Sequence, residues 1–235
     1  MRSFSFSRAS NAAILSFSVV LVGGMKPKSP DALRSLLYKV GRPLSSFHVG
    51  DTVTATHKKY SYRLDSDPGV LQADFKPELT PAEMLMVGVF EGTYLNDCYT
   101  EFPAEWFLGG LMTGRLSPGH PDAMLNCFGI KSRQPLSVWK ENGWAPTPGH
   151  TGNKNHYKGA LSDPRRNPDE RGWFQWYCRY WMGRRIPDLD ALQIRRWRAF
   201  TRHAGAIRAN CKKGDLTCRP RERQALLQWA WSPFI

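Results

Sequence analysis

The chain has 235 residues, a hydrophobic content of 41%, nine tryptophans and a formal net charge of +13 at pH 7. This length suits one sizeable domain, with or without an appended arm, and the hydrophobic content excludes an intrinsically disordered chain. The excess charge lies in residues 151–235, where 18 Lys and Arg face 7 Asp and Glu, whereas residues 1–150 carry 15 against 13.

The first 24 residues are left out of the fold prediction. Arg2 and Arg8 precede an apolar run at 12–22 that is too short to span a bilayer, so no transmembrane segment is predicted. A leader such as a secretory signal peptide, an organellar presequence and a non-native extension before a start at Met25 all fit this segment. Residues 25–75 then form an N-terminal arm, and residues 76–235 a basic helical domain.

Within the arm, residues 46–64 are rich in Val, Thr and Tyr and alternate in places. Such a segment can pair as a small β-hairpin or remain extended. Everything after it is typical of a mainly α fold. Thr80, Pro81 and Glu83 form a capping box, which predicts a helix from there to about Gly92.

An acidic cluster follows this helix and comprises Asp97, Glu101 and Glu105. If residues 97–105 formed one helix, this spacing would align the three carboxylates for general-acid chemistry or for a divalent metal. Pro103 argues against one unbroken helix and instead suits the start of a new one. The alternative is that these carboxylates favour the dipole of a nearby helix start.

Further along, residues 137–144 are expected to make a short helical turn, and residues 145–169 a loop rich in Gly, Pro and Asn. The chain contains no phosphate-cradling glycine pattern, no HExxH and no G-x-S-x-G. No cofactor is predicted.

An aromatic stripe lies between Gly172 and Gly183, and its spacing predicts a helix with five large rings on one face. The stripe consists of Trp173, Trp176, Tyr177, Tyr180 and Trp181. Such a stripe is more typical of a core than of a platform for stacking bases.

A second helix is expected after residues 184–187, capped by Asp188 or Asp190. Its wheel gathers Arg195, Arg198 and Arg202 opposite an apolar face that runs from Leu189 to Ile207. Arg196 falls among the apolar residues instead. It is either a snorkelling side chain or an arginine directed into a site.

Pro220 predicts the start of the last helix, where Arg219, Arg221 and Arg223 are mismatched to the helix dipole. A bound phosphate at this helix start would resolve the mismatch.

The five cysteines are an odd number without a regular framework, which favours a reducing, intracellular compartment. Secretion stays open if residues 1–24 are a signal peptide. Cys178, Cys211 and Cys218 could join His203 around zinc, but the short Cys-x-x-Cys pairs of zinc modules are missing, so no metal is predicted. A Cys211–Cys218 disulfide is not expected in the cytosol.

Four stretches resemble a family of small proteins of bacteria, viruses and algae for which no activity is established. They are LTPAEMLMVGVFEGTYLNDCYTEFPAEWF, QPLSVWKENGW, NPDERGWFQWYCRYWMGRR and CRPRERQALLQWAW. The resemblance covers roughly residues 75–235. It implies no catalytic residue and no cofactor.

The sequence thus predicts a protein that binds nucleic acid or another polyanion, with arginines along the phosphate backbone. The cations predicted to take part are Arg179, Arg184, Arg185, Arg195, Arg196, Arg198, Arg202, Lys212, Lys213, Arg219, Arg221 and Arg223. One alternative is an enzyme acting on nucleic acid or a phosphorylated substrate through the acidic cluster. Another is a structural or assembly protein with a Trp-rich surface for a protein partner.

Overall fold

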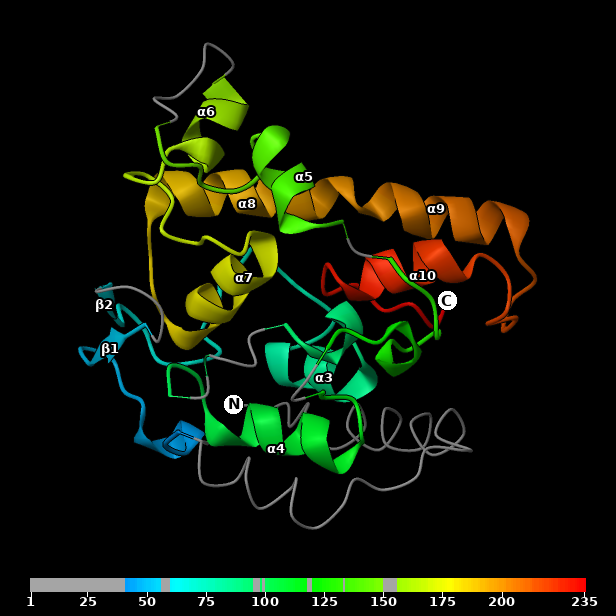
Figure 1. Cartoon of the computed structure of the whole chain (residues 1–235), viewed down its shortest axis with the longest axis horizontal. Helices are drawn as coiled ribbons and strands as arrows, with labels where there is room; N and C mark the ends of the chain where they lie inside the picture. The colour runs from blue at the N-terminus through cyan, green and yellow to red at the C-terminus, as the bar shows by residue number, and fades with distance from the viewer. Residues whose placement is uncertain are drawn as a thin grey trace, which may run out of the picture.

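The computed structural model describes residues 41–55, 60–94, 98, 100–117, 120–132, 134–149 and 156–235. Over these residues the fold is mainly α with one two-stranded sheet, which confirms the predicted class (Figure 1). The α-helices are α3 (Pro81–Val87), α4 (Ala104–Met112), α5 (Leu136–Glu141), α6 (His156–Ser162), α7 (Trp173–Met182), α8 (Pro187–Ala199), α9 (Thr201–Asn210) and α10 (Pro220–Leu227). Short 3-10 turns are η1 (Leu44–Ser46), η2 (Phe90–Gly92) and η3 (Ala123–Leu125).

The hairpin prediction for residues 46–64 is confirmed. Strands β1 (Thr52–Thr54) and β2 (Ser61–Arg63) pair antiparallel, with Val53 opposite Tyr62. These two side chains are buried, while their neighbours on both strands are exposed, as the alternation of a half-buried hairpin requires. Val53 and Tyr62 belong to the same buried cluster as α7, so the hairpin packs on the helical core.

The capping box is confirmed at α3. The Thr80 hydroxyl accepts a hydrogen bond from the Glu83 backbone N–H, and the Glu83 carboxylate accepts one from the Thr80 N–H. The helix ends earlier than predicted, because Gly88 adopts a φ of 108° and the chain turns away before η2. Helix α4 follows Pro103, as that residue predicts, and packs against α3.

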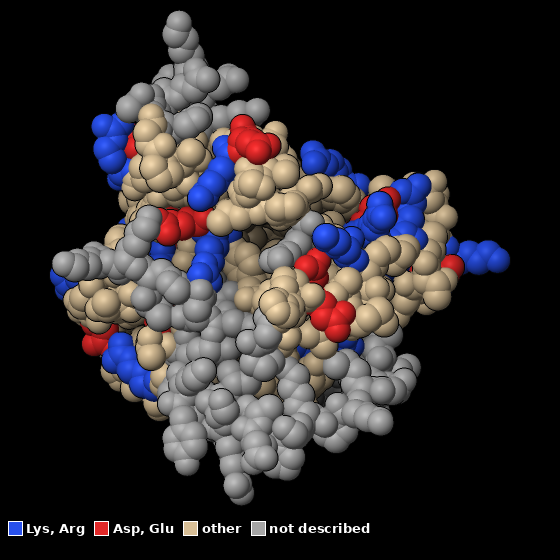
Figure 2. Space-filling view, in the orientation of Figure 1, with Lys and Arg blue, Asp and Glu red and all other residues tan. Residues whose placement is uncertain are grey.

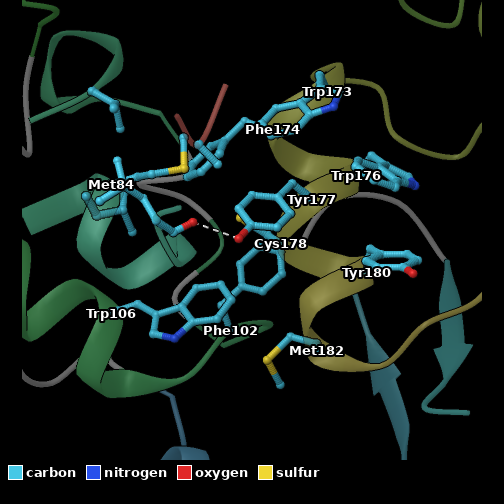
Figure 3. Close-up of a cluster of buried hydrophobic side chains, with 14 of the residues drawn as sticks. Met84, Phe102, Trp106, Trp173, Phe174, Trp176, Tyr177, Cys178, Tyr180 and Met182 are labelled. Atoms are coloured by element: carbon cyan, nitrogen blue, oxygen red, sulfur yellow. Dashed lines mark hydrogen bonds between the residues drawn. The ribbon is translucent and has the colours of Figure 1, made fainter. Parts of the chain in front are cut away.

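Helix α7 lies at the centre of the core. Trp173, Trp176, Tyr177 and Tyr180 are buried, so this part of the aromatic stripe is core, as expected (Figure 3). The fifth ring, Trp181, is partly buried and packs edge-on against Trp106 at 5.4 Å. The Tyr177 hydroxyl donates to the Leu79 carbonyl at 2.7 Å, which satisfies the polar atom of this ring and ties α7 to the chain before α3.

Helices α8 and α9 follow one another almost in line along one side of the molecule, with α7 below α8 and α10 beside α9 (Figure 1). They are separated at Phe200, where the predicted single helix is interrupted. The predicted cap was also wrong: Ile186 is the N-cap, because Pro187 occupies the first helical position. Asp190 still stabilises the start, since its carboxylate accepts the Ile186 N–H at 2.7 Å.

The short turn predicted at 137–144 is α5, which begins one residue earlier. The loop predicted at 145–169 contains α6 instead, and this helix packs near α8. The candidate residue Asp97 and the segment 1–24 lie outside the described residues. None of the helices in the described part of the chain has the length and apolar character needed to cross a membrane.

Candidate functional site

The arginine row, defined as Arg195, Arg198 and Arg202, is exposed on one side of α8 and α9. Arg198 pairs with Asp74, but both side chains are more than half exposed, so water and salt screen this contact. Neither Arg195 nor Arg202 forms an ion pair with any described residue. The row therefore presents positive charge to solvent.

Two of the other predicted cations are buried in an ion-pair network. The Arg179 guanidinium contacts Glu101 at 2.6 Å and Asp169 at 2.9 Å, and Arg184 binds both oxygens of Asp169 at 2.8 and 2.7 Å. Burial alone would raise the pKa of Asp169, but the charges and hydrogen bonds of Arg184 and Arg179 outweigh it and lower that pKa. These arginines are committed to the fold and are not available to a phosphate.

Two further arginines hold backbone carbonyls. Arg185 donates to the carbonyl of Tyr180 at 2.6 Å, and its guanidinium carbon lies 4.1 Å from the centre of that ring. Arg223 is fully buried, and it donates to the carbonyls of residues 215, 218, 233 and 235. The mismatch between Arg223 and the helix dipole is thus resolved by carbonyl oxygens from the neighbouring turns.

The remaining predicted cations lie near the C-terminal end of α9 and the start of α10. Lys212, Lys213 and Arg221 are exposed, and Arg219 pairs with Glu222 at 2.8 Å. Figure 2 shows Lys and Arg side chains over α9 and α10.

The two described carboxylates of the acidic cluster, Glu101 and Glu105, are held by separate parts of the fold. Glu101 is buried against Arg179 in the turn before α4, and Glu105 accepts the Leu44 N–H at 2.9 and 3.1 Å. Glu101 and Glu105 do not share one helix, because α4 begins only at Ala104, after Pro103, which confirms the expectation that this proline starts a new helix.

The expectation for Cys211 and Cys218 was also wrong, because they form a disulfide that joins the end of α9 to the turn before α10. Cys178 is buried in α7 as a free thiol. Within the described residues, no three His, Cys, Asp or Glu side chains come together in a group that could hold a metal ion.

A cavity of about 580 Å³ lies beside the arginine row, and a hollow is visible below α5 in Figure 2. Its described walls come from five segments, residues 90–94, 132 with 134–144, 171–174, 196–202 and 225–229. This volume falls in the range of about 300–1,000 Å³ that is usual for small-molecule sites.

Eight of the eighteen described residues that line the cavity are aromatic. Trp229 lies 4.7 Å from Trp173 and 4.1 Å from Phe200, the latter at an interplanar angle of 16°. Trp139 and Trp144, from α5 and the following turn, meet edge to face at 5.9 Å. Flat apolar walls of this kind favour a planar ligand.

Three arginines, Arg171, Arg196 and Arg202, line the same cavity. Arg196 is only 8% exposed; it donates to Gln193 at 2.7 Å, and its guanidinium lies 5.1 Å from the Trp229 ring. Of the two interpretations of Arg196, the one that directs it into a site fits this position. No described residue of the cavity wall is acidic, so the cavity favours an anion.

A hydrogen-bond donor also belongs to the wall. Gln228 lines the cavity and is 6% exposed, and its amide nitrogen is buried without a hydrogen-bond partner in the described part of the chain. A buried donor of this kind costs free energy until it finds an acceptor.

The sequence pointed to Arg196 and to Arg202, but not to the cavity. The only sequence signal for the cavity was Arg196, since it interrupted the apolar face of its helix.

Comparison of the chain with protein-family models, with curated proteins and with solved structures finds no match. The family resemblance therefore stays a prediction, and the case for function rests on the geometry of the site.

Proposed function

We propose that the protein binds nucleic acid through the arginine row. The observation that carries this proposal is the exposure of Arg195, Arg198 and Arg202 on one side of α8 and α9, beside a cavity lined by further arginines. Guanidinium groups spaced along a helix can follow a phosphate backbone without reading its sequence.

The distribution of charge supports a polyanion as the ligand. Residues 151–235 carry 18 Lys and Arg against 7 Asp and Glu, and the cations that hold the fold, such as Arg179 and Arg223, account for only part of this excess. The exposed Lys212 and Lys213 extend the positive surface beyond α9. A surface of this kind attracts phosphates over distances of about 10 Å at moderate salt.

The alternatives have less support. An enzyme that uses Glu101 and Glu105 would need them in the cavity, and neither lines it. An assembly surface would need an exposed apolar patch, and only five large apolar side chains of the described residues are exposed. They are Val49, Val70, Met112, Met124 and Leu136.

The test is fluorescence-anisotropy binding of the full chain to labelled single-stranded and duplex oligonucleotides across a salt series. We expect affinity to fall steeply with salt, because each phosphate contact releases a counterion. In the Arg195→Gln/Arg198→Gln variant, the slope of log affinity against log salt should shrink by about 0.7 per lost contact on single strands.

The matched control is Arg63→Gln/Arg166→Gln, which also removes two positive charges, but from exposed positions on β2 and in the loop before α7. It should leave the salt slope almost unchanged. Equal effects of the two variants would mean that net charge alone drives binding, and the proposal would then be wrong.

A further inference from the structure

We infer that the cavity beside the arginine row is a nucleotide site, in which an unpaired base lies among the aromatic side chains and its phosphate is held by Arg202. The choice of a nucleobase over other planar rings rests on the proposed function. The cavity itself stands on its own geometry.

The first step of the argument is position. Arg202 belongs to the exposed arginine row and also lines the cavity, so the phosphate-binding surface and the aromatic walls meet at one residue. A phosphate bound by Arg202 therefore has its attached nucleoside at the cavity mouth. In an intact duplex that base would be paired and stacked, so only an unpaired base can enter.

The second step is the match between the walls and a base. Stacking on an aromatic ring is worth about 1–3 kcal/mol per base, and it tolerates any base because each has a π face. Trp139 and Trp144 are only partly buried, so their rings offer surface to a ligand, whereas the rings of α7 are packed in the core.

The third step concerns polar groups. Gln134 and Ser132, whose side chains are not buried, line the cavity together with Gln228. Nucleobases carry ring nitrogens and carbonyl oxygens at their edges, which are acceptors for such donors.

The direct experiment titrates the full chain with the 5′-mononucleotides AMP, GMP, CMP and UMP and follows tryptophan fluorescence. We expect saturable quenching, and binding about ten-fold weaker for the matching nucleoside, which has no phosphate to meet a guanidinium. In Trp144→Leu and in Arg202→Gln we expect affinity to fall by about ten-fold each.

Arg208→Gln is the matched control, because Arg208 is exposed on the same helix as Arg202 and does not line the cavity. It should leave mononucleotide affinity unchanged. Trp144 packs against Trp139, so Trp144→Leu could lose binding because it misfolds. Arg202→Gln changes an exposed side chain and therefore tests the site without this risk.

Failure of this inference is distinct from failure of the proposed function. Salt-dependent strand binding without any binding of mononucleotides at millimolar concentration would overturn the nucleotide site and leave the arginine row in place. Mononucleotide binding that Trp144→Leu weakens, without strand binding, would overturn the proposed function alone. Benzoate binding as tightly as AMP would show a site for any planar anion, which also overturns the inference.

Discussion

At the scale of single residues, charge at buried positions decides which arginines can meet a ligand. Asp169 is fully buried and binds both Arg179 and Arg184. The sequence does not show that Arg179 forms a buried ion pair, because its partner Glu101 is 78 residues away along the chain. Only the three-dimensional fold shows that one group holds the core while the other faces solvent.

We therefore predict that Asp169→Asn strongly destabilises the fold. Removing one member of a buried charge network leaves uncompensated charge and typically costs about 3–5 kcal/mol. The free energy of unfolding, measured by urea titration, reports the loss. The control is Asp74→Asn, which breaks the exposed pair with Arg198 and should cost about 0–1 kcal/mol.

This prediction has a pH signature. The folded pKa of Asp169 is lowered, so its contribution to stability is present above the unfolded pKa of about 3.9 and is lost as pH falls below that value. Asp169→Asn should therefore flatten the acid limb of the curve of unfolding free energy against pH. An unchanged acid limb together with a loss below about 1 kcal/mol would contradict the role of the network.

At the scale of elements, periodicity and local signals predict helices well where few alternatives compete. The capping box of α3 and the stripe of α7 are confirmed, because both depend on spacing within one helix. Where the prediction is wrong, tertiary contacts intervene. Helix α3 stops at Gly88, where an added Cβ would lie 2.4 Å from the Leu125 carbonyl oxygen, so the chain there passes close to a distant segment.

The end of α7 offers a test of this view. Gly183 adopts a φ of 115°, and a Cβ built on it would lie 2.0 Å from the backbone oxygen of Ser66. Gly183→Ala should cost more than about 2 kcal/mol, because the left-handed backbone alone costs roughly 1–2 kcal/mol for an L-residue and Ser66 must also move. Thermal and urea unfolding measure this loss.

Gly205→Ala is the matched control within α9. A Cβ there meets no atom within 4 Å, and the residue is exposed on the helix. Replacing a helical glycine by alanine should stabilise the fold by roughly 0.5–1 kcal/mol. If both substitutions changed stability by the same amount and in the same direction, the contact between α7 and Ser66 would not limit the end of the helix.

At the scale of the whole molecule, the cavity could not be predicted from the sequence. Its walls join residues 90–94 with residues 225–229, and no periodicity or motif connects such distant segments. The fold class and the basic face were within reach, because composition and helical spacing are local. The cavity depends on how α5, α7, α8 and the C-terminal segment pack together.

Because the cavity is built from five segments, ligand binding is expected to affect the stability of the whole fold. A ligand that binds only when all five segments are assembled stabilises the native state against complete unfolding, by about 2.7 kcal/mol at 100 times its Kd. We expect AMP to raise the melting temperature in a concentration-dependent way, whereas adenosine at equal concentration should raise it less, because it has no phosphate to meet Arg202. Differential scanning fluorimetry measures the melting temperature with each ligand.

The Arg202→Gln variant should lose most of the rise in melting temperature that AMP causes, and Arg208→Gln should keep it. A melting temperature that AMP raises equally in both variants would mean that the nucleotide binds elsewhere on the basic surface, since Arg202 lines the cavity and Arg208 does not.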